Sequence, residues 1–110
     1  MADAGRADTS RRFDELIARY VPDPQVSLGT GFGKSRGLRV GGKVFAIFGE
    51  RDLTLKLPGA KVDELVDAGA GTRFNPGHGR EMREWVTIPD SRAREWAVLA
   101  DQARDFVRPR

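Results

Sequence analysis

The chain has 110 residues, no cysteine and a formal net charge of +3. A chain of this length has room for one domain around one hydrophobic core. Without cysteine it has neither disulfides nor thiolate metal ligands. No stretch approaches the roughly 20 apolar residues of a membrane-spanning helix, and residues 1–5 lack the charged and then apolar pattern of a secretory signal. We therefore expect a cytoplasmic protein with neither a membrane nor a metal as partner.

The N-terminal part of the chain predicts a tail, one helix and two short strands. Residues 1–8 are expected to form a flexible tail, after which Thr9 or Ser10 caps the helix. Apolar residues then follow at helical spacing, namely Phe13, Leu16, Ile17 and Tyr20. Two prolines end this helix. Residues 25–28 and 37–40 are expected to be short strands.

The strongest strand pattern lies in residues 43–57, where β-branched and aromatic residues alternate around a turn that contains glycine. A turn centred on Glu50 and Arg51 brings three apolar pairs onto one face of a hairpin. These pairs are Phe48 with Leu53, Ala46 with Leu55, and Val44 with Leu57. This face is therefore the predicted core side of the sheet.

The C-terminal half predicts two more helices, separated by a loop and a strand. Pro58 suits the first turn of a helix that Gly69 can end. Residues 70–81 are expected to form a glycine-rich loop with at most a short strand inside it, and residues 82–88 the next strand. The last helix then runs to residue 107, and residues 108–110 form a C-terminal tail.

The order of these elements predicts an α+β fold with a single domain over residues 9–107. It has two layers: a mainly antiparallel sheet of four to five strands, and three amphipathic helices on one face of the sheet. The other face of the sheet is then left open.

The open face of the sheet is the first candidate binding surface. Alternation places Phe45 and Ile47 on this face. On the strand over residues 82–88, alternation turns the side chain of Trp85 toward the same face. Lys56 and Arg83 supply a polar edge to this patch. A contiguous exposed apolar patch marks an interface. We therefore expect a protein partner or a second copy of the chain to bind here, as in a small regulatory domain without enzymatic activity.

Two glycine-rich segments give the alternatives. Either residues 29–34 or residues 70–81 fold over the open face and cover it. Residues 29–35 also end like a phosphate-binding loop, but Leu28 stands where that motif needs glycine, and a strand pattern follows in place of a helix. His78 is the single histidine, and no second group can be named to orient it as a base. The sequence predicts no enzyme and no cofactor, and phosphate chemistry at this loop and His78 is the weakest alternative.

The basic residues support a further hypothesis. No acidic residue lies between Asp23 and Glu50. Candidate nucleic-acid contacts in and after this stretch are Lys34, Arg36, Arg39, Lys43 and Arg80. Basic loops beside exposed aromatic side chains suit phosphate contacts and base stacking. Nonspecific binding of nucleic acid, such as DNA, is therefore the alternative function, while solvated surface charge is the simplest interpretation of each single residue.

Three segments carry a family resemblance. Residues 41–46 (GGKVFA), 53–57 (LTLKL) and 79–86 (GREMREWV) resemble the MmcQ/YjbR-like proteins and the related N-terminal domain of TfoX. The resemblance covers roughly residues 10–107. It implies an antiparallel sheet with helices on one side and a DNA-binding or regulatory role, and it brings no catalytic residues to carry over.

Overall fold

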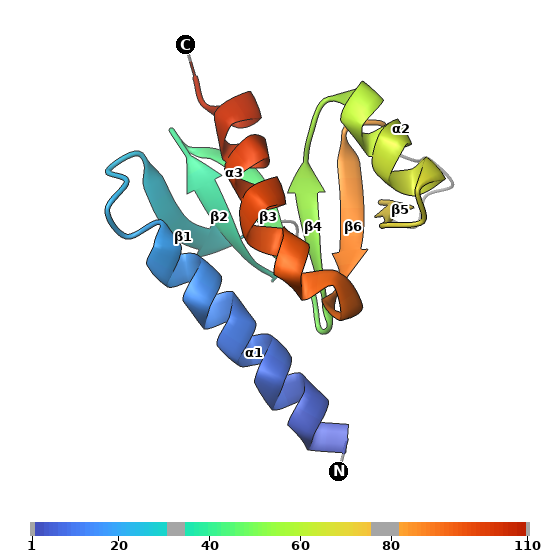
Figure 1. Ribbon diagram of the computed structural model, residues 1–110. Helices are drawn as coiled ribbons and strands as arrows, with labels where there is room; N and C mark the ends of the chain where they lie inside the picture. The colour runs from blue at the N-terminus through green and yellow to red at the C-terminus, as the bar shows by residue number, and fades with distance from the viewer. Residues whose placement is uncertain (1, 31–34, 76–81, 110) are drawn as a thin grey trace.

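The computed structural model describes residues 2–30, 35–75 and 82–109, with residues 2–7 and 30 described through their backbone. The elements follow one another along the chain as the ribbon shows (Figure 1). They are α1 (Ala2–Arg19), β1 (Val26–Thr30), β2 (Arg36–Val40), β3 (Lys43–Phe48), β4 (Asp52–Lys56), α2 (Gly59–Asp67), β5 (Thr72–Arg73), β6 (Trp85–Pro89), the 3₁₀ helix η1 (Asp90–Glu95) and α3 (Trp96–Val107).

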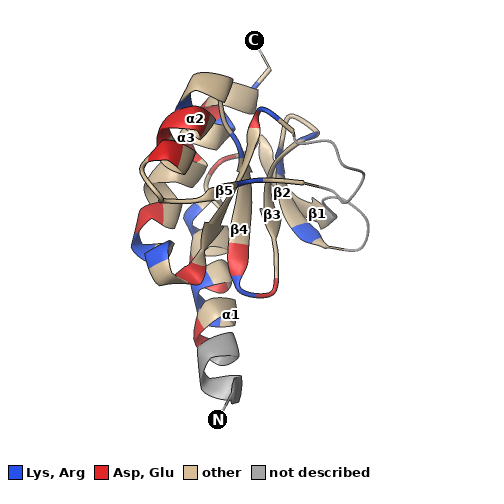
Figure 2. Cartoon of the chain, turned by 90° about the vertical axis from the view of Figure 1, so that its right-hand side faces the viewer, with Lys and Arg blue, Asp and Glu red and all other residues tan. Residues whose placement is uncertain are grey.

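The six strands form one antiparallel sheet in the order β1-β2-β3-β4-β6-β5. The three helices lie on one side of this sheet (Figure 2). The predicted α+β fold with two layers is therefore confirmed, with slightly more strands than the four to five expected. The extra strand reflects β5, a two-residue element that the sequence marks only weakly.

The first helix begins earlier than the sequence predicted. α1 starts at Ala2, where a flexible tail over residues 1–8 was expected. The segment before Thr9 is rich in alanine, the best helix former, and Asp8 forms ion pairs with arginines one turn further along. Thr9 does not begin the helix. Its side chain is 1% exposed, and its hydroxyl donates a hydrogen bond of 2.8 Å to the carboxylate of Asp90, which fixes α1 against η1.

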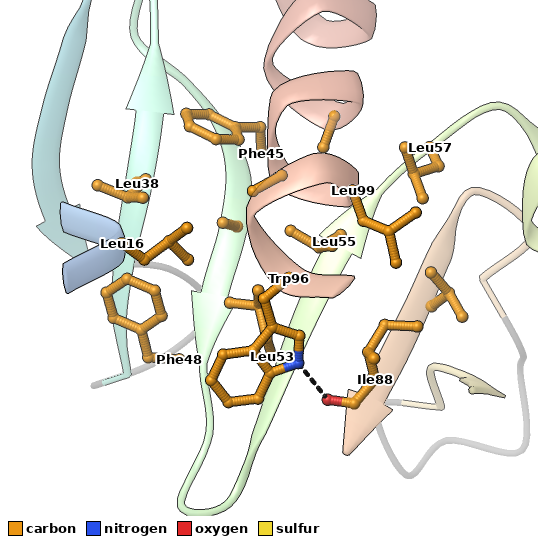
Figure 3. Packing of buried hydrophobic residues seen from close by; sticks show 14 of the residues in the cluster. Leu16, Leu38, Phe45, Phe48, Leu53, Leu55, Leu57, Ile88, Trp96 and Leu99 are labelled. Atoms are coloured by element: carbon orange, nitrogen blue, oxygen red, sulfur yellow. Dashed lines mark hydrogen bonds between the residues drawn. The ribbon is translucent and has the colours of Figure 1, made fainter. Parts of the chain in front are cut away.

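The core fills the space between the sheet and the helices (Figure 3). The ring of Phe13 on α1 stacks between Phe48 and Trp96, at centroid distances of 4.7 and 5.2 Å. The indole N–H of Trp96 donates to the carbonyl of Ile88 at 3.2 Å, so this fully packed side chain leaves no polar atom without a partner. This arrangement joins α1, α3 and the strands β3 and β6 into one core.

The pairing of β3 with β4 follows the predicted register. Ala46 lies opposite Leu55, and Phe48 lies opposite Leu53. All four side chains belong to the core cluster. The prediction of a core face on this hairpin is therefore confirmed for these two pairs.

The pairing of β3 with β2 contains a β-bulge that the sequence did not predict. Leu38 lies opposite Ala46 and Arg39 opposite Val44, which leaves Phe45 without a partner on β2. A bulge interrupts the strict alternation of side chains, and here it turns Phe45 toward the helices. Its side chain is 0% exposed and belongs to the core cluster. The prediction that Phe45 faces outward is wrong.

The residues after α3 pack against the domain where a C-terminal tail was predicted. The guanidinium of Arg108 donates to the carboxylate of Asp23 at 2.5 Å, which joins the end of α3 to the turn before β1. Pro109 lies against Gly41, where a Cβ atom would come within 2.6 Å of the proline ring. Gly41 also has a φ of +57°, so both its backbone and its surroundings favour glycine.

Candidate nucleic-acid interface

The face of the sheet that points away from the helices is well buried at its centre. Ile47 is 7% exposed, Thr54 5% and Trp85 6%. The hydroxyls of Thr54 and Thr87 share a hydrogen bond of 2.8 Å between β4 and β6. Ile47 and Trp85 lie outside the main core cluster, as predicted, but they are not accessible. With Phe45 in the core, the predicted patch of exposed apolar side chains is absent from the described part of the chain.

The two polar residues predicted at the edge of this patch lie near Trp85. The ammonium group of Lys56 is 5.8 Å from the centroid of the Trp85 ring, which is a cation–π distance. Arg83 is exposed and precedes β6 by two residues. The backbone carbonyl of Trp85 accepts a hydrogen bond of 3.0 Å from the amide of Phe74. Because Trp85 is buried and the Lys56 ammonium lies beside its ring, the indole offers no free surface on which a nucleotide base could stack.

Several predicted candidates lie outside the described residues. Lys34 falls in residues 31–34, while His78 and Arg80 fall in residues 76–81. Their proposed roles, and the expectation that one of these loops covers the outer face, stay predictions.

The segment that resembles a phosphate-binding loop leads into a strand. β2 begins at Arg36, directly after Ser35, so the backbone there offers no helix N-terminus to a phosphate. Within residues 2–30, 35–75 and 82–109, no group of three or more potential metal ligands comes together. The same residues include no helix long and apolar enough to span a membrane.

Three of the predicted nucleic-acid contacts are described, and they lie on the neighbouring strands β2 and β3. At the N-terminal end of β2, the guanidinium of Arg36 is 5.6 Å from the ring centroid of Phe48 on β3. At the other end, Arg39 donates to the carbonyl of Gly42 at 3.1 Å. Lys43, the residue after Gly42, is exposed. The structure thus brings Arg39 and Lys43 to one end of the hairpin and places Arg36 at the opposite end.

These anchoring contacts could not be found from the sequence. The bond from Arg39 to Gly42 depends on the tight turn between β2 and β3, in which Gly41 and Gly42 both have positive φ. The approach of Arg36 to Phe48 depends on the register of β2 with β3. The only signal available in the sequence was the long interval without an acidic residue.

The helices differ from these strands in how their charges are balanced. Acidic residues on the helices and their connections form ion pairs with neighbouring basic residues. The pairs are Asp8 with Arg11 and Arg12, Asp23 with Arg104 and Arg108, Asp63 with Arg73, Glu64 with Lys61, Glu95 with Arg92, Asp101 with Arg19, and Asp105 with Arg104. Acidic and basic residues are accordingly mixed over the helices in Figure 2. Strands β2 and β3 contain basic residues, and none of the strands β1, β2 and β3 contains an acidic residue.

The ion pairs of the helical layer lower the pKa of carboxyl groups that take part in them. A hydrogen bond from Arg19 is the main cause that lowers the pKa of Asp101. For Asp23, the backbone amide of Gln25 lowers the pKa most, followed by the Arg108 guanidinium. These carboxylates stay ionised and neutralise the bases beside them. The basic residues of β2 and β3 have no such acid within the strands β1–β3.

The model of the YjbR family matches residues 23–106. That match runs from the turn before β1 almost to the end of α3, which is most of the chain. The chain belongs to the YjbR family. The matched part of this YjbR domain contains the whole sheet, including the acid-free strands, and leaves out α1. No curated protein and no solved structure matches the chain at a significant level. The resemblance to MmcQ/YjbR-like proteins is therefore confirmed.

Proposed function

We propose that this YjbR domain is a cytoplasmic, non-enzymatic binding domain that binds nucleic acid through the acid-free strands β1–β3. The observation that carries this proposal is the uneven balance of charge. Most basic residues of the helical layer lie beside ionised carboxylates, whereas Arg36, Arg39 and Lys43 stand on strands without an acid. A rigid sheet also holds these bases at fixed spacing, which reduces the entropy lost when phosphates bind.

The proposed binding is electrostatic and does not depend on sequence. Trp85 is buried and offers no surface on which nucleotide bases could stack. The basic residues at the two ends of β2 are suited to contacts with the phosphate backbone. Nonspecific complexes of this kind have dissociation constants of about 10⁻⁴ to 10⁻⁶ M at physiological salt. The affinity should fall steeply as salt increases, because binding releases the counterions of the phosphates.

The experiment is a titration of a fluorescently labelled duplex of random sequence at several salt concentrations. Lys43→Gln removes one exposed charge from the hairpin. It should weaken binding equally for all sequences and reduce the slope of log K against log salt by about 1. Arg94→Gln is the matched control, because Arg94 is an exposed base on η1 outside the acid-free strands. It should change neither the affinity nor the slope.

Two results would contradict the proposal. One is the absence of binding even at low salt, where the electrostatic attraction is strongest. The other is an equal loss of affinity for Lys43→Gln and Arg94→Gln, which would mean that net charge alone matters and that β1–β3 form no particular surface.

The apolar residues that supported self-association through the outer face of the sheet are not exposed. Phe45 lies in the core, and Ile47 and Trp85 are buried. Lys56 and Arg83, at the edge of the predicted patch, remain candidate contacts, where their positive charges would add to that of β2 and β3.

A further inference from the structure

The two edges of the sheet are built differently. The edge at β5 has two residues, one of them the charged Arg73. The edge at β1 has five residues, Val26–Thr30, without a charge or a proline. Natural sheets protect their edges from other strands with short strands, charges, proline or bulges. The β5 edge uses two of these devices, and β1 uses none.

At the middle residue of β1, the backbone N–H and C=O groups point away from the sheet. The carbonyl of Gln25 accepts a hydrogen bond of 2.9 Å from the amide of Gly41 on the β2 side. Inward and outward groups alternate along an antiparallel strand. Ser27 and Gly29, opposite Arg39 and Gly37, therefore bond to β2, and Leu28 directs both its N–H and its C=O outward.

The side chain at the same position is also unusual. Leu28 lies opposite Leu38, a core residue, and so faces the helical side of the sheet. It is nevertheless 53% exposed, because it lies at the rim of the core. Its neighbour Val26 is partly buried and packs against the core cluster. A strand added beside β1 would bury Leu28 and extend the core in the plane of the sheet.

We infer that β1 pairs with β1 of a second copy of this chain, antiparallel and around a twofold axis at Leu28. A second copy fits because the edge is self-complementary under such an axis. Leu28 then lies opposite the Leu28 of the other copy, and their backbones exchange two hydrogen bonds. In this register Ser27 lies opposite Gly29 of the other copy, and these two small residues cause no steric conflict. No charge on β1 meets its like.

This pairing has a distinctive dependence on salt. It joins the acid-free strands of both copies at the middle of one continuous sheet, so Arg36, Arg39 and Lys43 of the two copies repel one another. Added salt screens this repulsion and strengthens the dimer. Binding to nucleic acid, by contrast, weakens with salt. The dimer does not depend on the proposed binding of nucleic acid, and the two can be tested separately.

The first test measures the dimer by sedimentation equilibrium without nucleic acid, at low and high salt. We expect the wild type to dimerise more strongly at high salt and Leu28→Lys to weaken the dimer at least tenfold. The matched control is Val98→Lys, because Val98 on α3 is 59% exposed and lies away from β1. At a protein concentration low enough for all three proteins to be monomeric, thermal unfolding of both variants should match the wild type, since neither position is buried.

The second test locates the contact. The chain has no cysteine, so Leu28→Cys provides a single thiol on the proposed axis. Directly opposed residues have Cα atoms about 5.5 Å apart, within the range of a disulfide. Mild oxidation should therefore crosslink Leu28→Cys into a dimer much faster than Val98→Cys.

Three outcomes would overturn the inference. They are a wild type that stays monomeric at every concentration and salt tested, equal crosslinking of the two cysteine variants, and a monomer that captures an added extended peptide in place of a second copy. A failure to bind DNA would leave all three measurements unaffected.

Discussion

Strands β3 and β4 are neighbours in the middle of the sheet, yet only one of them follows the rule of alternation. In β4, Leu53 and Leu55 are fully buried in the core and Thr54 lies on the other face. In β3, Phe45 and Ala46 follow one another and both lie in the core. The comparison shows that alternation predicts the facing of a strand only where no bulge interrupts the ladder.

The difference has its origin in the side chains themselves. In β4, the polar residues at 54 and 56 fix which face is turned outward. From Val44 to Phe48, β3 is apolar at every position, so burying either face satisfies the hydrophobic effect. The bulge between Leu38 and Arg39 then adds the large side chain of Phe45 to the core. Changes in these two strands test this comparison directly.

The largest effect is expected for Phe45→Lys. Truncating a buried phenylalanine costs about 3–5 kcal/mol, and an unpaired charge in the core costs more. Since a whole domain is stable by only about 5–15 kcal/mol, much of this variant should be unfolded. Urea denaturation measures the effect, with Val44→Lys as the control on the half-buried neighbour. If the two variants were equally stable, Phe45 would lie on the surface and the bulge would be absent.

The next effect is expected for Leu55→Ala on β4. Its side chain is 0% exposed and lies opposite Ala46, so the truncation should lower the free energy of unfolding by about 2–5 kcal/mol. Leu55 and Phe45 would then prove to be equal members of one core, although only Leu55 was predicted from the sequence. A loss below about 0.5 kcal/mol, within the range of surface substitutions, would mean that the core is centred elsewhere.

The sequence predicted the features that depend on local patterns, and it failed where distant contacts decide. The apolar spacing of α1 and the register of Leu53 and Leu55 with β3 were predictable because each repeats within a few residues. The position of Phe45 depends on a bulge in the pairing of β3 with β2, which alternation within β3 does not reveal. Alternation places Trp85 on the face of the sheet that points away from the helices. It does not show whether other parts of the chain cover that face, so the burial of Trp85 could not be predicted.

The candidate interface shows the same division. The absence of acidic residues across β1–β3 could be read directly from the chain. The ion pairs that neutralise the helical layer could not, because they join segments as distant as Arg19 and Asp101. The exposed edge at Leu28 was likewise hidden, since only the order of the strands shows that β1 lies at the rim of the sheet.

A smaller effect is expected on the outer face, where β4 meets β6. Thr54→Val removes one partner of the 2.8 Å hydrogen bond between the hydroxyls of Thr54 and Thr87. The remaining hydroxyl loses its partner at a half-buried site, so the cost should be about 1–2 kcal/mol. The double variant with Thr87→Val should recover part of that loss, because two apolar groups then pack together. A double-mutant cycle by denaturation measures the coupling, and strictly additive losses would contradict it.

The smallest effect concerns what holds Phe45 in place. The ring of Tyr20 packs edge-on against Phe45 at 5.6 Å, and its hydroxyl donates to Asp101 at 2.8 Å. Burial and this hydrogen bond raise the pKa of the Tyr20 phenol, so it remains protonated and donates at neutral pH. Tyr20→Phe keeps the ring and loses only the hydrogen bond, which should cost about 1 kcal/mol.

The contribution of this bond should depend on pH in one direction. Hydrogen bonds from Arg19 and Tyr20 lower the pKa of Asp101 in the folded state. A carboxyl with a lowered pKa stabilises the fold fully above the pKa of the unfolded chain, near 3.9 for aspartate, and loses this contribution as the pH falls through the folded value. The stability lead of the wild type over Asp101→Asn should therefore be constant near neutral pH and shrink below about pH 4. Because the site is partly exposed, salt should reduce this lead. A lead that grows on acidification would show that Asp101 does not stabilise the packing of Tyr20 on β3.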